Sequence, residues 1–156
     1  KKEIMDCAQK TFISSTFWTE RTGPTAALAT IDFMKKNKTW KEVKRIGEQI
    51  QKKWIKIAQD NNIKIKINGI PSLSNFIFSS PYHQKYKTLI TQEMLLENIL
   101  ATNAVYPCID HTDKIINFYF EKLNDVFKKI KKCEDGHDIN KYLKSKDSMK
   151  EFKRLN

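Results

Sequence analysis

Residues 63–78 read IKIKINGIPSLSNFIF, and within them the period of the sequence changes from helical to extended. Isoleucine alternates strictly with polar residues over 63–67, which is typical of a strand buried on one face. Residues 68–71, Asn-Gly-Ile-Pro, have turn chemistry. Residues 73–78 follow as the antiparallel neighbour. The stretch therefore predicts a hairpin with strands over 63–67 and 73–78.

Amphipathic helices are predicted on both sides of this hairpin. Pro24 is suited to opening a helix, and Thr39 with Glu42 three residues later forms a capping-box pattern. The predicted elements are helices over 24–36 and 39–60, the two hairpin strands, a helix over 84–98, a strand over 104–109, a helix from 113 to about 130 and a short helix around 139–143. The order α-α-β-β-α-β-α predicts an α/β fold, a two-layer small domain with a short three-stranded sheet covered by helices.

Each long helix has one apolar stripe that we expect to form the core. The stripes are Ala27, Leu28, Ile31 and Met34; Val43, Ile46, Ile50, Trp54 and Ile57; Tyr86, Leu89, Ile90, Met94 and Leu96; and Ile116, Phe120, Leu123, Phe127 and Ile130.

A hydroxyl-rich segment, residues 11–22, precedes the first of these helices and contains Phe12, Phe17 and Trp18. These aromatic residues come before every predicted core element, so we expect them to pack against another surface and to favour aggregation or dimerisation. Hydroxyls before a helix suit an anion such as phosphate, because helix N-termini present unpaired N–H groups. Ordinary capping gives the same pattern, and the residues alone leave both interpretations open.

The net charge of +11, from 29 basic and 18 acidic residues, suggests an anionic partner. Only three of the basic residues are arginines, however, and arginine is favoured for bidentate phosphate and base recognition. We therefore favour compositional drift over a nucleic-acid site. A free-standing, lysine-rich module that binds nucleic acid or another polyanion is the alternative function.

Neither disulfides nor a metal site is predicted. The cysteines are odd in number, dispersed and without a C-x-x-C pattern: Cys7, Cys108 and Cys133. The histidines share no ligand spacing: His83, His111 and His137. No apolar run approaches the roughly 20 residues that cross a bilayer. The dispersed cysteines fit a reducing compartment, so we expect a cytoplasmic protein. The chain starts without methionine, so we also expect it to be part of a longer protein.

Residues 110–113, Asp-His-Thr-Asp, lie between a predicted strand and the last long helix, where α/β folds often bind ligands. Alternatively, Asp110 or Thr112 caps the helix and His111 packs locally. The chain has no nucleophile elbow, phosphate loop or dinucleotide fingerprint, so no self-contained active site is predicted.

Residues 4–6 and 11–30, the latter reading TFISSTFWTERTGPTAALAT, resemble class-III aminotransferases of the glutamate-1-semialdehyde aminomutase-like group. The resemblance continues at residues 100–106, at the His-Thr pair 111–112 and at residues 152–156, so it extends over nearly the whole chain.

The resemblance implies a fold-type-I enzyme that uses pyridoxal 5'-phosphate to move an amino group between an amino donor and a carbonyl substrate. It also implies a homodimer. Residues 1–23 would form an interface and phosphate-binding loop at the end of a large domain, 24–135 the C-terminal small domain, and 136–156 a short helix and polar tail. The lysine that binds the cofactor would precede this chain, so we nominate no catalytic residue and expect the chain alone to be inactive. Aminotransferase and aminomutase activities both stay open.

One family role can be transferred to this sequence. A threonine a few residues before the proline-started helix binds the cofactor phosphate in the family, and an ungapped count back from Pro24 gives Thr19. The usual glycine-rich spacer is replaced here by residues 20–23, Glu-Arg-Thr-Gly. Ser15 and Thr16 are therefore alternative phosphate ligands, and Arg21 is a candidate contact for the phosphate or a substrate carboxylate.

Overall fold

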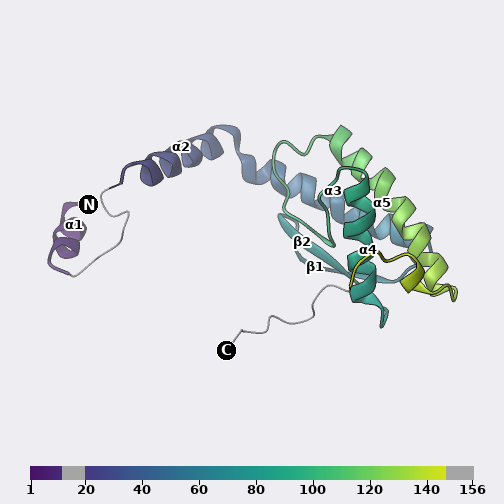
Figure 1. The fold of residues 1–156 in the computed structure, drawn as a ribbon. Coiled ribbons are helices and arrows are strands. Elements are labelled where there is room, and N and C mark those ends of the chain that lie inside the picture. Colours follow the sequence, from purple (N-terminus) through teal and green to yellow (C-terminus); the bar gives the residue numbers. More distant parts are fainter. Residues whose placement is uncertain (12–19, 147–156) are drawn as a thin grey trace, which may run out of the picture. The chain divides into compact units, whose positions relative to one another are not determined.

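The computed structural model describes residues 1–11 and 20–146 of the chain (Figure 1). These residues form five α-helices, a short 3-10 helix and one three-stranded sheet. The elements are α1 (Lys2–Gln9), α2 (Thr22–Asn37), α3 (Thr39–Asp60), β1 (Ile65–Ile70), β2 (Leu73–Phe78), α4 (His83–Leu96), β3 (Ala104–Val105), α5 (Asp113–Glu134) and η1 (Ile139–Lys141). The predicted order is confirmed from α2 to α5, whereas α1 was not predicted.

The chain divides into two compact units. The first, Lys1–Lys38, contains α1 and α2, and the second, Thr39–Asn156, contains the sheet and the remaining helices. The second unit is a small α/β domain in which α3, α4 and α5 pack with an antiparallel sheet of order β1-β2-β3 (Figure 1). The assignment of 1–23 and 24–135 to a large and a small domain stays a prediction.

The hairpin of β1 and β2 is confirmed, but its predicted turn is wrong. Strand pairing runs from Ile65 opposite Phe78 to Ile70 opposite Leu73, so residues 68–70 belong to β1 and the turn is Pro71-Ser72. Gly69 has a positive φ of 86°, a conformation that glycine adopts without strain, and pairing continues through it. Three of the four residues that predicted a turn, 68–70, therefore belong to strand β1.

The start of β1 also differs from the prediction, because Ile63 lies in the connection between α3 and β1, two residues before the strand begins. Its N–H donates to the carbonyl of Ala58 at 2.8 Å, which satisfies one of the last helical carbonyls. The predicted alternation is confirmed in the burial pattern, since Ile63 is buried and Ile65 and Ile67 are half-buried against the core.

Strand β3 is much shorter than the predicted strand over 104–109. Only Ala104 and Val105 pair with β2, opposite Asn75 and Ser74. Proline has no N–H to donate to a ladder, so Pro107 cannot extend the pairing.

An aromatic cluster joins the sheet to all three covering helices. Phe76 of β2 lies 4.9 Å from Trp54 of α3 and 5.9 Å from Phe127 of α5, measured between ring centroids. Phe78 lies 5.3 Å from Tyr86 of α4 in an edge-to-face arrangement. Such contacts stabilise a core beyond the burial of apolar area alone.

The predicted stripes of the second unit are confirmed with two exceptions. The buried members are Ile46, Ile50, Trp54, Ile57, Tyr86, Leu89, Ile90, Met94, Ile116, Phe120, Leu123, Phe127 and Ile130. Val43 is only half-buried and Leu96, at the last residue of α4, is 61% exposed. Contrary to the prediction, no residue of α2 is buried.

Helix α3 passes very close to the hairpin turn. A Cβ atom added to Gly47 would lie 1.9 Å from the carbonyl oxygen of Pro71, so only glycine fits at this crossing. The predicted capping box at the start of α3 is not formed in that way, because the Glu42 carboxylate accepts hydrogen bonds from Arg45 at 2.6–3.1 Å. The Glu42 side chain therefore pairs with Arg45, about one turn further into the helix, instead of capping the helix start.

The segment after η1 packs against the core through Tyr142 and Leu143, and one side chain of α4 also hydrogen-bonds it at two points. The Gln92 amide nitrogen donates to the carbonyl of Tyr142 at 2.9 Å, and its oxygen accepts from the N–H of Lys144 at 2.7 Å. The predicted short helix over 139–143 is the 3-10 turn η1, whose Ile139 is buried in the core. Glu93, next to Gln92, forms an ion pair with Lys129 that links α4 to α5.

Candidate functional site

The predicted cofactor-binding hydroxyls lie outside the described residues. Ser15, Thr16 and Thr19 all fall within 12–19, as do Phe12, Phe17 and Trp18 of the expected interface. Their roles stay predictions.

Arg21 is described, and it occupies the N-cap position of α2. It is exposed, its side chain makes no capping hydrogen bond, and its carbonyl accepts from the N–H of Thr25 at 3.0 Å. The first turn of α2 contains no acidic residue, although Glu20 precedes it. Among the described residues the Arg21 guanidinium has no hydrogen-bond or ion-pair partner, and together with the N–H groups of a helix start it is a donor set that fits a phosphate group.

The segment 110–113 forms the start of α5 and follows the capping alternative. The Thr112 hydroxyl accepts from the N–H of Ile115 at 3.4 Å, which makes Thr112 the N-cap. The carboxylate of Asp113 accepts from Gln49 of α3 at 3.1 Å. His111 packs locally, as its Nδ1 accepts from the N–H of Cys108 at 3.1 Å.

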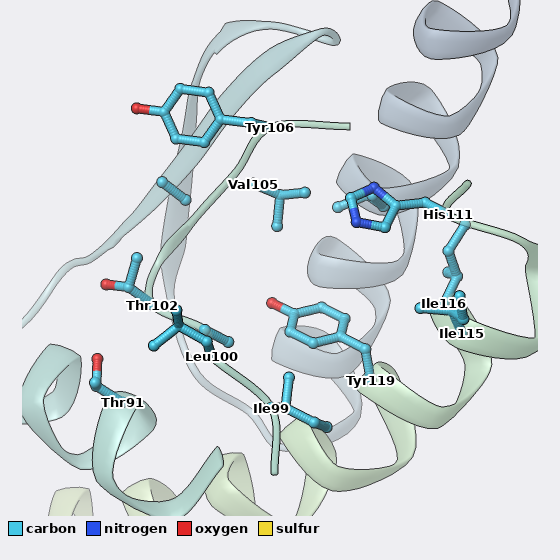
Figure 2. A pocket seen from close by; sticks show the side chains of 13 residues that line it. Thr91, Ile99, Leu100, Thr102, Val105, Tyr106, His111, Ile115, Ile116 and Tyr119 are labelled. Carbon is cyan, nitrogen blue, oxygen red and sulfur yellow. The ribbon is translucent and has the colours of Figure 1, made fainter. Parts of the chain in front are cut away.

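His111 also lines a pocket of about 480 Å³ that lies entirely within the second unit (Figure 2). The pocket is bounded by α3, α4, the segment 99–106 and the first turns of α5. Its walls are largely aliphatic: Ile50, Ile99, Ala101, Val105, Ile115 and Ile116. No lysine, arginine, aspartate or glutamate of the described chain lines it. Its volume is in the range of small-molecule sites, about 300–1,000 Å³.

Tyr119 of α5 is a second polar side chain that lines this pocket. Its hydroxyl oxygen accepts from the indole Nε1–H of Trp54, which is fully buried, at 3.1 Å. Burial raises the pKa of the Tyr119 phenol, so the hydroxyl keeps its proton at physiological pH. The sequence analysis missed Tyr119 because it lies beside the α5 stripe, next to Phe120. A polar aromatic residue at the edge of an apolar stripe was the signal available.

Within residues 1–11 and 20–146, no group of three or more histidine, cysteine or acidic side chains could hold a metal ion. Cys7 and Cys108 are exposed and Cys133 is buried. In the same described ranges, every helix is too short or too polar to cross a bilayer.

Comparisons with known proteins point to one relative. The chain is similar to the 3-aminobutyryl-CoA aminotransferase of Cloacimonas acidaminovorans (strain Evry), with 25% identity over 138 residues. The similarity extends over 85% of this chain and 33% of that protein. No family model matches the chain. The chain therefore spans about a third of the length of the curated relative that it matches.

Proposed function

We propose that this chain is the C-terminal part of a class-III, pyridoxal-phosphate-dependent aminotransferase resembling the glutamate-1-semialdehyde aminomutase group. The similarity to an aminotransferase, over 138 residues that cover 33% of that protein, is the observation that carries this proposal. The motif over residues 11–30 supports it independently. The name of the relative favours amino-group transfer between two molecules over intramolecular aminomutase chemistry.

In this proposal the residues before α2 bind the cofactor phosphate. Thr19 donates to the phosphate, with Ser15 and Thr16 as alternative donors, and Arg21 contacts the phosphate or a substrate carboxylate. The start of α2, where Arg21 makes no side-chain capping bond and the first turn has no acidic residue, supports this assignment. When bound, the cofactor supplies an electron sink for the amino-acid carbon. The lysine that holds it belongs to a preceding segment, and the enzyme acts as a cytoplasmic homodimer.

Mapping the cofactor linkage tests the proposal. The protein that contains this chain is loaded with pyridoxal phosphate, reduced with borohydride, digested and examined by mass spectrometry. We expect one stoichiometric label on a lysine that precedes Lys1. A specific stoichiometric label on any of the 26 lysines of this chain would refute the proposed division of roles, and no label at all would refute the cofactor.

The phosphate-binding role has its own variant. Thr19→Val removes a hydroxyl that donates to a charged acceptor, so we expect cofactor affinity to fall about tenfold or more. Thr30→Val, an exposed threonine of α2, is the matched control and leaves the affinity unchanged. Equal affinity for both variants would transfer the role to Ser15 or Thr16.

The alternative function, binding of nucleic acid or another polyanion, rests on the net charge alone. Several lysines are engaged by carboxylates of the same helix, such as Lys44 with Glu48 and Lys128 with Asp125. Saturable, steeply salt-dependent DNA or RNA binding by the protein would support this alternative over the aminotransferase.

A further inference from the structure

The pocket between α4 and α5 contains a hydrogen-bond donor without a partner. The Tyr119 oxygen already accepts from Trp54, and no acceptor among the described residues lies within hydrogen-bond distance of its O–H. Figure 2 shows this hydroxyl facing the centre of the pocket. Because leaving a secluded donor unpaired is costly, the group is suited to an acceptor supplied by a ligand.

His111 offers a second donor to the same space. Its Nδ1 accepts from the N–H of Cys108, and a neutral imidazole that accepts at Nδ1 has its proton on Nε2. Within residues 20–146 no acceptor for Nε2 is found. Figure 2 shows the ring directed toward the space that the Tyr119 hydroxyl also faces.

Of the other polar side chains at the pocket, Thr91 and Thr102 have partners within the chain, and Tyr106 is 73% exposed to solvent. The Thr91 hydroxyl donates to the carbonyl of Lys87 at 3.3 Å, and the Thr102 hydroxyl donates to the side chain of Asn103 at 3.2 Å. Tyr119 and His111 are therefore the donors directed toward the interior of the pocket, whereas the Tyr106 hydroxyl is directed away from them (Figure 2).

The residues that line the pocket determine whether a ligand can be charged and how apolar its body should be. An ionised group is strongly disfavoured in an apolar pocket that has no opposite charge, and no acidic or strongly basic side chain of the described residues lines this one. Leu100 and Tyr106 at the pocket are 90% and 73% exposed. An apolar ligand body that contacts these side chains would remove apolar surface from water.

We propose that this pocket binds a small uncharged molecule with an apolar body and one carbonyl oxygen, a ketone, ester or amide, which accepts from Tyr119 and His111. The pocket involves the second unit only, so the proposal does not depend on the cofactor assignment.

A matched series of ring compounds tests the ligand chemistry. The full chain is titrated with cyclohexanone, cyclohexanecarboxylate, cyclohexylamine and methylcyclohexane, and binding is followed through backbone amide shifts in NMR. We expect saturable shifts confined to residues 99–106 and the start of α5. We also expect cyclohexanone to bind about tenfold tighter than each of the other three compounds.

Two variants test the donors. Tyr119→Phe keeps the ring and removes the O–H, and His111→Phe removes the imidazole donor. Each is expected to weaken cyclohexanone about fivefold, the effect of one hydrogen bond. Tyr82→Phe, an exposed tyrosine outside the pocket, is the control and changes nothing. Tyr119→Phe also removes the acceptor of the Trp54 indole N–H, so this variant can lose stability as well as ligand affinity. His111→Phe leaves that bond in place, and its thermal unfolding is expected to match that of the wild type. A loss of affinity in His111→Phe therefore tests the proposal even if Tyr119→Phe is unstable.

Three results would overturn the proposal. Equal binding of the carboxylate or the amine would exclude recognition of a neutral acceptor. Shifts outside the pocket, or none at saturating cyclohexanone, would exclude the site. The third result is a dimer in sedimentation whose formation protects Leu100 from solvent and prevents cyclohexanone from binding. It would show that a second copy of the chain occupies the pocket.

Discussion

Helices α2 and α5 both have apolar residues at helical spacing, yet their surroundings are opposite. Helix α5 buries seven side chains, with Phe127 fully buried, whereas α2 buries none and leaves Leu28 63% and Phe33 51% exposed. The stripe of α5 is covered by α3, α4 and the sheet of its own unit. Spacing therefore predicts an apolar face correctly, but it does not say whether the covering surface lies in the same unit.

The largest test of this difference uses one substitution in both helices. Phe127→Ala empties a fully buried position and should lower the free energy of unfolding by about 3–5 kcal/mol. Phe33→Ala on α2 should change it by less than about 0.5 kcal/mol, because the ring is half exposed. Urea unfolding measures both. A large loss in Phe33→Ala would show that α2 is buried in solution.

Two glycines sharpen the comparison because their substitution by alanine should change stability by very different amounts. Gly47→Ala places a Cβ against the backbone of Pro71 and should destabilise the second unit by about 1–3 kcal/mol. Gly23→Ala in α2 meets nothing within 4 Å beyond its chain neighbours, but a Cβ directly before Pro24 disfavours helical backbone and offsets the gain in helix propensity, so stability should change by less than about 0.5 kcal/mol. Hydrogen exchange of each helix reports the two effects separately. A clear loss of hydrogen-exchange protection in helix α2 of the Gly23→Ala variant would contradict this expectation.

The helix starts differ on a smaller scale. Thr112→Ala removes the hydroxyl that caps α5 and should cost about 1 kcal/mol of unfolding free energy. Arg21→Ala removes an N-cap residue without a side-chain capping bond, so stability should not change. Thermal unfolding followed by circular dichroism gives both values. A matching loss in Arg21→Ala would assign its side chain a structural role.

The smallest effect concerns pH. Burial alone would raise the pKa of Glu93, but hydrogen bonds from Lys129 and Gln92 outweigh it and lower the pKa below 4.5. A lowered folded-state pKa contributes stability above the unfolded value, and this contribution is lost as the pH falls through the folded-state pKa. Unfolding of Glu93→Gln should therefore depend less on pH below about 4.5, with a cost of about 1 kcal/mol or less at neutral pH. Asp125→Asn, from an exposed pair, is the control. Identical pH profiles for Glu93→Gln and the wild type would exclude this role.

The sequence predicted the second unit well because its signals are local. Periodic stripes determined α3, α4 and α5, and the alternation near Ile65 determined the hairpin. The errors arose where distant contacts or backbone chemistry prevailed: Gly69 continued the strand through a turn signal, and Pro107 ended β3 early.

The candidate site was less predictable. The capping role of Thr112 follows from residue type and position, so it was among the stated alternatives. The pocket required the chain from 99 to 106 to lie against Tyr119, and that proximity comes from tertiary packing which no spacing encodes. The phosphate-binding hydroxyls were found through resemblance and stay predictions.

The amide of Gln92 makes the chain sensitive to chemical ageing. It imitates a peptide group, with one donor and one acceptor matched to Tyr142 and Lys144. Deamidation to glutamate would replace the donor with a carboxylate oxygen facing the Tyr142 carbonyl, and two acceptors repel each other. A change of about one dalton at this position would therefore loosen the segment after η1 and leave it held mainly by the packing of Tyr142 and Leu143 against the core.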